Sequence, residues 1–118
     1  MSSKVLPSPK GVVLIVSPWN YPIQLALMPL MSALSAGNTA IVKVSEISSH
    51  TGRLLTQIIN ETFDSNLVFA TDVGPEEFHD LLELPYDHLF FTGSPSIGKI
   101  MMSAAAKHLT PVTLELGG

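Results

Sequence analysis

The stretch Val12-Val13-Leu14-Ile15-Val16-Ser17-Pro18-Trp19-Asn20-Tyr21-Pro22 predicts the architecture of this chain. Residues 12–16 are aliphatic without alternation, which is typical of a strand buried on both faces of a parallel sheet. Pro18 ends this strand and Pro22 fits the first turn of a helix, so a turn lies between them. Ligands bind at such turns in open α/β sheets. Trp19 and Asn20 are therefore candidate site residues; alternatively, Asn20 caps the helix and Trp19 packs on the sheet.

The composition limits the classes of protein to which the chain can belong. Its 118 residues suffice for one domain with a real core. Hydrophobic residues make up 46% and charged residues 14%, so either most of the chain is interior or part of its surface packs against something else. The net charge is −4 and the six basic residues stand singly, which argues against nucleic acid as a partner. The absence of cysteine excludes disulfides, thiolate metal sites and a cysteine nucleophile within these residues.

Neither a metal site nor a membrane segment is predicted. The histidines have no metal-ligand spacing and are expected at the surface or at helix ends: His50, His79, His88 and His108. Residues 1–10 lack the sustained apolar run of a secretory signal. The apolar stretch 23–36 is too short to span a bilayer and contains Pro29. We expect a cytoplasmic protein.

Apolar runs and turn residues predict five strands that alternate with four helices. The expected strands are 12–16, 39–44, 67–70, 88–91 and 112–116. The expected helices are 22–36, about 50–61, a segment that starts at Pro75, and a segment from Ile97 to His108. This order predicts an α/β fold, a Rossmann-like doubly wound parallel sheet. Residues 1–10 form a lead-in, and residues 11–118 form the domain.

Two of these helices carry more detailed predictions. The helix over 22–36 is apolar on nearly every side, so we expect it to be buried, bent at Pro29 and ended by Gly37. Ser48 or Ser49 can cap the next helix. That helix is expected to turn one apolar face inward, made of Leu54, Leu55, Ile58 and Ile59.

The glycine turn after the fourth strand is a candidate anion site. Gly93 allows a tight turn, Ser94 offers a hydroxyl group, and the following helix presents unpaired N–H groups. Residues 93–99 also fit the first seven positions of a P-loop, but Ile100 stands where a hydroxyl residue would hold magnesium. The dinucleotide-binding glycine fingerprint is absent from the turn after the first strand. A dinucleotide-phosphate turn, a structural turn and a P-loop are the alternatives.

Charged residues stand within or next to two of the predicted apolar strands. Lys43 lies in a buried-type strand, where an ammonium group needs an anion or a hydroxyl partner, and Glu46 follows the strand. A ribose would suit this position; alternatively, the lysine stem reaches the sheet edge. Glu115 lies between two leucines near the end of the fifth strand. Burial there would raise its pKa toward that of a general base, whereas simple alternation would turn it to water.

Taken together, these turns resemble the aldehyde dehydrogenase superfamily, and most closely its class 3 and fatty aldehyde branch. The matching pieces occur in family order from about Pro9 to the end of the sequence. They are Ser17-Pro18-Trp19-Asn20-Tyr21-Pro22, Ser35-Ala36-Gly37-Asn38, Lys43-Val44-Ser45-Glu46, Phe91-Thr92-Gly93-Ser94 with Gly98, and residues 104–118, AAAKHLTPVTLELGG. Val44 stands where the family usually has proline.

The resemblance implies a role for each motif. Asn20 would donate its amide to the oxyanion that forms when a thiolate attacks an aldehyde, and Glu115 would activate the water that hydrolyses the thioester. The remaining residues would bind NAD or NADP in a domain spanning 11–118. They are Lys43 and Glu46 on the adenosine ribose, Gly93, Ser94 and Gly98 at the pyrophosphate turn, and Ser17, Trp19 and Leu116 elsewhere in the cofactor site. These roles require Asn20 and Glu115 to lie at the same end of the sheet.

The resemblance also implies what lies outside these residues. In the family the nucleophilic cysteine follows the segment that ends here, so we expect a truncated enzyme, inactive alone. The full-length relative would be a homodimer that oxidises fatty or aromatic aldehydes to carboxylic acids. The alternative is a non-catalytic nucleotide-binding or interaction module, and in either case exposed apolar faces would allow self-association.

Overall fold

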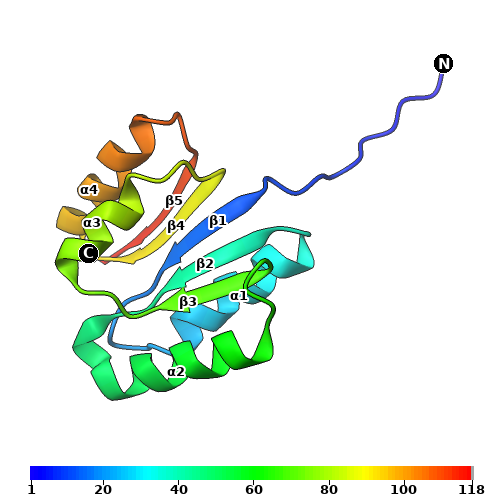
Figure 1. The fold of residues 1–118 in the computed structure, drawn as a ribbon. Coiled ribbons are helices and arrows are strands. Elements are labelled where there is room, and N and C mark those ends of the chain that lie inside the picture. The colour runs from blue at the N-terminus through cyan, green and yellow to red at the C-terminus, as the bar shows by residue number, and fades with distance from the viewer. Residues whose placement is uncertain (118) are drawn as a thin grey trace.

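Five parallel strands form a single sheet in the order β3-β2-β1-β4-β5 (Figure 1). The structure is a computed structural model that describes residues 1–117, so Gly118, the last residue of the predicted domain, lies outside the described residues. The strands are β1 Val12–Val16, β2 Thr39–Lys43, β3 Val68–Thr71, β4 His88–Gly93 and β5 Val112–Leu116. The predicted α/β class with five parallel strands is confirmed. β4 is longer than expected, because it continues to the glycine of the turn.

Four helices and one short turn of 3-10 helix connect the strands. They are α1 Gln24–Ser35, η1 Glu46–Ser48, α2 Ser49–Thr62, α3 Pro75–Leu82 and α4 Pro95–Ala106. In Figure 1, α1 and α2 cover one face of the sheet, and α3 and α4 cover the other. Residues 1–10 form neither helix nor strand and extend away from the sheet.

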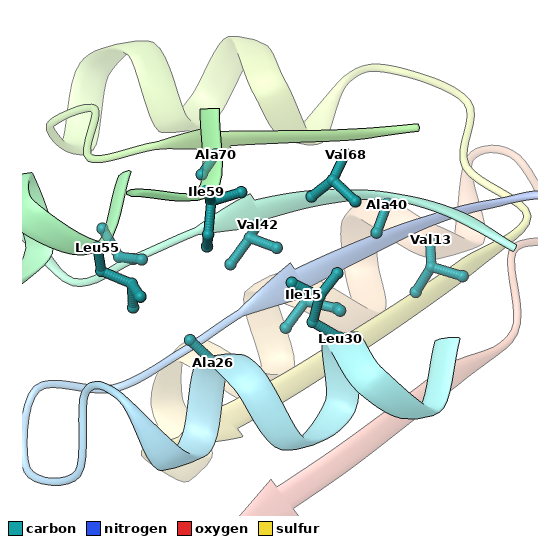
Figure 2. Close-up of a cluster of buried hydrophobic side chains, with 11 residues drawn as sticks. Val13, Ile15, Ala26, Leu30, Ala40, Val42, Leu55, Ile59, Val68 and Ala70 are labelled. Carbon is teal, nitrogen blue, oxygen red and sulfur yellow. The ribbon is translucent and has the colours of Figure 1, made fainter. Parts of the chain in front are cut away.

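The sheet separates two apolar cores, as expected for a doubly wound fold. One core packs α1 and α2 on the face of the sheet that carries Val13 and Ile15 (Figure 2). The other packs α3 and α4 on the face that carries Leu14 and Val16. Leu14 and Ile15 are fully buried, so the uninterrupted aliphatic run is explained by helices on both sides of β1.

The prediction that the first helix is buried on all sides is wrong for the described residues. Only Ala26 and Leu30 of α1 are buried, whereas Met28 and Met31 are 53% and 54% exposed. α1 contacts β1 and β2, and no described helix covers the same face of β4 and β5. The apolar surface of α1 therefore faces outward. The helix also begins at Gln24 and not at Pro22.

Two further predictions, both about α2, are wrong. Leu55 and Ile59 are buried, but Leu54 and Ile58 are more than half exposed, so the inward stripe is narrower than the apolar pattern. Ser48 occupies the N-cap position without a side-chain capping bond. Its hydroxyl instead donates to the Ser45 carbonyl at 3.3 Å, because the chain first makes the short 3-10 turn.

One side chain of α2 pairs with the outer edge of the sheet. The Asn60 amide donates to the Ala70 carbonyl at 2.9 Å, and the Asn60 Oδ1 accepts from the Ala70 N–H at 2.8 Å. These two bonds replace the pairing that a further strand would provide beside β3. Asn60 therefore blocks part of an edge that could otherwise pair with another chain.

Replacing Asn60 with leucine is expected to lower the free energy of unfolding by about 1 to 2 kcal/mol, because both Ala70 groups lose their partner. Urea unfolding followed by circular dichroism measures the change. Gln57→Leu on the same helix is the control, since the Gln57 side chain bonds only the exposed Glu61. Equal unfolding midpoints for the two variants would contradict this role for Asn60.

Candidate functional site

The candidate residues meet at the edge of the sheet where the strands end. Val16, the last residue of β1, pairs with Lys43 of β2 on one side and with Phe91 of β4 on the other. Gly93 of β4 pairs with Leu116 of β5. Because all five strands are parallel, the turns that follow them lie at one edge of the sheet. Two adjoining hollows lie there.

The first hollow, here called the lysine hollow, has a volume of about 330 Å³. Its walls come from the ends of β1, β2 and β4 and from the starts of α3 and α4. Six predicted cofactor residues line it: Ser17, Trp19, Lys43, Glu46, Gly93 and Ser94. Pro75, Phe78 and Ile97 provide apolar walls.

Lys43 is buried at the side of this hollow, with 5% of the residue exposed. Its ammonium group forms an ion pair and a hydrogen bond with the Glu46 carboxylate. Burial alone would raise the pKa of Glu46, but the hydrogen bond from Lys43, a backbone hydrogen bond and the charge of Lys43 together outweigh burial and lower this pKa. Lys43 therefore has the anionic partner that a buried ammonium requires, and the alternative of a stem reaching the sheet edge is wrong.

Ser17 supplies a polar group that has no partner among residues 1–117. The residue is 4% exposed and its Oγ forms no hydrogen bond, although its backbone N–H donates to the Lys43 carbonyl at 3.1 Å. A buried hydroxyl group without a partner is costly, and Ser17 lines the lysine hollow. The hollow thus offers a bound molecule a hydroxyl, a carboxylate and an ammonium group.

The second hollow, here called the asparagine hollow, has a volume of about 540 Å³. It is lined by Trp19 and Asn20 from the first turn, by the Gly93 turn, and by Glu115 and Leu116 from the end of β5. Trp19, Gly93 and Ser94 also line the lysine hollow, so the two hollows adjoin. Asn20 and Glu115 therefore lie at the same end of the sheet, as their predicted roles require.

The structural alternatives for Trp19 and Asn20 are both wrong. Trp19 is 58% exposed and does not pack on the sheet. The N-cap position of α1 is Ile23, and Asn20 lies outside the helix. The Asn20 Oδ1 accepts a hydrogen bond from the Tyr21 N–H at 3.2 Å. This bond assigns the oxygen to the backbone, so the amide NH₂ group can donate to a ligand.

Glu115 is exposed at the end of β5, so of the two alternatives for this residue, burial and a side chain turned to water, the second is observed. Thr113 and Glu115 point to the open face of the sheet, and Leu114 points into the core beside α3 and α4. The strand therefore alternates, as the structural alternative predicted.

The Gly93 turn is shaped by close packing. A Cβ atom at Gly93 would lie 2.5 Å from the Phe91 ring, so a side chain does not fit there. Ser94 is the N-cap of α4, and its Oγ accepts from the Ile97 N–H at 3.4 Å. Residues 95–99 are helical and do not form the loop of a P-loop.

Gly98 lines neither hollow. A Cβ atom at Gly98 would lie 2.9 Å from a methyl group of Leu116, so this glycine brings α4 close to β5. Among the predicted cofactor residues, the structure therefore gives Gly98 a packing position and no contact with either hollow. Lys99, the P-loop candidate, is exposed on α4.

A third hollow, here called the apolar groove, lies between α1 and the open face of β4 and β5. Its volume is about 610 Å³, and its walls include Leu25, Met28 and Phe90. Glu115 lines both this groove and the asparagine hollow.

For two residues beside these hollows, the sequence pattern gave a wrong prediction or none. His88 is not at the surface: it is partly buried in the apolar groove, and its Nε2 bonds to the Thr113 Oγ1 at 2.9 Å. Burial, with the charge of Lys10, lowers the pKa of His88. Phe78 was missed, although its spacing of four from Leu82 places both residues on the inner face of α3.

The described residues contain no cluster of three side chains suited to bind a metal ion. No helix formed by residues 1–117 is both long and apolar enough to cross a bilayer.

Comparisons with known proteins agree with the resemblance. The model of the aldehyde dehydrogenase family matches residues 1–118. Mus musculus aldehyde dehydrogenase family 3 member B2 is 50% identical over 117 residues, which are 99% of this chain and 24% of that protein. The substrate-bound Staphylococcus aureus AldH structure is 50% identical with a TM-score of 0.91, over 94% of this chain and 24% of that one. The structure of a Mycobacterium tuberculosis aldehyde dehydrogenase complexed with NAD+ is 34% identical with a TM-score of 0.82. That match covers 93% of this chain and 23% of the other. The chain thus spans about a quarter of the relatives that it matches.

Proposed function

The chain belongs to the aldehyde dehydrogenase family, and from this premise we propose that it is the cofactor-binding part of an NAD(P)-dependent enzyme that oxidises fatty or aromatic aldehydes to carboxylic acids. The observation that carries the proposal is that the lysine hollow adjoins the asparagine hollow at the ends of the strands. A nucleotide and an aldehyde carbon can therefore be held next to each other.

The residues of the lysine hollow fit a nicotinamide dinucleotide. Glu46 and the ammonium group of Lys43 suit the hydroxyl groups of a ribose, and the unpaired Ser17 hydroxyl suits a polar atom of the ligand. The Ser94 hydroxyl and the Ser96 N–H at the start of α4 suit a pyrophosphate, since a helix N-terminus attracts anions. Pro95 has no N–H, and the Ile97 N–H already donates to Ser94 Oγ. When bound, the dinucleotide accepts the two electrons that leave the aldehyde carbon.

Asn20 and Glu115 supply the polar groups of the asparagine hollow. The Asn20 NH₂ group would donate to the aldehyde oxygen as negative charge develops there, which is worth roughly 10² to 10³ in rate. Glu115 would take a proton from the attacking water. No residue of this chain is a cysteine, so the nucleophile of the reaction is not among these 118 residues, and we expect the chain alone not to oxidise aldehydes.

The apolar groove supports the choice of aldehyde class. It meets the asparagine hollow at Glu115, and its walls carry hydrocarbon side chains such as Leu25 and Met28. An aldehyde with an alkyl or aromatic substituent would bury apolar surface against such walls, which favours its binding.

The purified chain is expected to bind NAD in a saturable manner. Lys43→Ala is expected to raise the dissociation constant for NAD by about tenfold, because the ribose loses a charged donor. Isothermal titration calorimetry measures both constants. Lys99→Ala is the control, since Lys99 lines neither hollow. Absence of NAD binding would contradict the proposal. Loss of nucleotide binding in Lys99→Ala, but not in Lys43→Ala, would favour a P-loop.

A second candidate function is a non-catalytic module that binds a partner or a second copy of itself. The observation that favours it is the exposed apolar surface of α1, where Met28 lines the apolar groove and Met31 is also exposed. A chain that binds no nucleotide and forms dimers in sedimentation velocity would fit this second function.

A further inference from the structure

The charges of the lysine hollow bear on which dinucleotide it takes. Among the described residues that line it, Lys43 and Glu46 are the charged ones, and they are paired with each other. The hollow therefore has no net charge. A ligand with an extra anionic group finds no unpaired cation in it.

A third side chain restrains this pair. The Lys43 Nζ lies 5.1 Å from the centre of the Phe78 ring, within the range of a cation–π contact. Phe78 lies in the first half of α3 and packs against the core between the sheet and α3 and α4. This packing restrains the position of its ring. The Lys43 side chain is only 7% exposed between the ring and the Glu46 carboxylate. Both the Phe78 ring and the Glu46 carboxylate thus attract the ammonium group.

We propose that Phe78 is a specificity-determining residue, which holds Lys43 on Glu46 so that the lysine hollow takes NAD in preference to NADP. This inference rests on the proposed function of the hollow as a cofactor site. NAD and NADP differ in one group, the 2′-hydroxyl of the adenosine ribose, which carries a phosphate in NADP. The hydroxyl can donate to the Glu46 carboxylate, whereas a phosphate cannot.

The electrostatics of the pair disfavour the phosphate. It would bring a charge of about −1.5 to −2 next to the Glu46 carboxylate, and like charges at an interface repel. Lys43 could compensate only by leaving Glu46 for the phosphate. The lowered pKa of Glu46 agrees with a carboxylate that keeps its charge beside Lys43 at neutral pH. The Phe78 ring opposes the movement of the ammonium group, because its attraction for the cation would be lost.

The test compares NAD and NADP dissociation constants for the 118-residue chain by calorimetry at one ionic strength. NADP is expected to bind at least about tenfold more weakly than NAD, and Phe78→Leu to reduce this ratio to about threefold or less. Phe78→Trp keeps an aromatic face and is expected to keep the ratio. Phe69→Leu is the matched control, because Phe69 lies on β3 away from the lysine hollow.

Glu46→Gln keeps the test decisive if Phe78→Leu does not fold, which circular dichroism reports. This variant leaves the charge of Lys43 uncompensated, so NADP is expected to gain at least about threefold relative to NAD. Equal NAD and NADP affinities in the unmodified chain would overturn the inference but not the proposed cofactor site. An unchanged ratio in Phe78→Leu, or in Glu46→Gln, would also overturn it. Absence of binding to either dinucleotide would overturn both proposals.

Discussion

Replacing Asn38 with alanine is expected to lower the free energy of unfolding by about 3 kcal/mol, because three hydrogen bonds of about 1 kcal/mol each are lost. The Asn38 Oδ1 accepts from the N–H groups of Lys10 at 2.7 Å and Gly11 at 3.0 Å. Its Nδ2 donates to the Ala33 carbonyl at 3.1 Å. One buried side chain thus joins the end of α1 to the residues that lead into β1. Urea unfolding measures the loss.

Asn66→Ala is the matched control for this prediction, since Asn66 is exposed in the loop before β3. Small domains are stable by about 5 to 15 kcal/mol, so a loss of 3 kcal/mol is a large fraction of the total. If Asn38→Ala and Asn66→Ala unfold at the same urea concentration, Asn38 does not fasten β1 to α1 in the way described.

Replacing Gly93 with alanine is expected to cost about 2 kcal/mol of stability, which is typical of an overpacked core, and to weaken NAD binding by at least about tenfold. The new Cβ would lie 2.5 Å from the Phe91 ring. Phe91 is almost fully buried and lines the lysine hollow, so relief of the clash moves its ring or opens the Gly93 turn. Thermal unfolding and calorimetric titration with NAD measure the two effects.

The control for Gly93 is Gly74→Ala. A Cβ atom at Gly74 would lie 3.3 Å from the Glu77 carboxylate, the mobile end of an exposed side chain, and Gly74 lines neither hollow. This variant is expected to keep NAD affinity and to lose no more than about 1 kcal/mol of stability, because Gly74 is the N-cap of α3 and alanine is a poorer N-cap residue. NAD affinity in Gly93→Ala equal to that of Gly74→Ala would show that the Gly93 turn is not part of the proposed cofactor site.

The position of the candidate site could be predicted because it follows from strand direction. Asn20 and Glu115 lie far apart in the sequence, but each follows or ends a strand of the same parallel sheet. Parallel strands bring their carboxyl ends to one edge, so any two such residues approach each other. The sequence also predicted that Lys43 needs an anion or a hydroxyl partner, and the structure provides Glu46, three residues further along the chain.

The exposure of individual side chains could not be predicted, because it depends on which helix covers which part of the sheet. Glu115 and His88 both lie on the face of β4 and β5 that α1 does not reach. The strand pattern is the same whether that face is covered or open. Glu115 is therefore exposed and His88 half-buried in this structure, although the sequence left both burial and exposure open for Glu115 and indicated the surface or a helix end for His88.

By itself, the sequence determined the order of strands and helices, the parallel sheet and the edge at which its polar turns gather. These features depend on local apolar runs and on proline and glycine, which act over a few residues. Only the tertiary structure decided that Phe78 faces the Lys43 ammonium group, that Asn60 pairs with the β3 edge and that α1 presents methionines to solvent. Those contacts join separate elements, so they depend on how helices pack on the sheet, which local patterns do not specify.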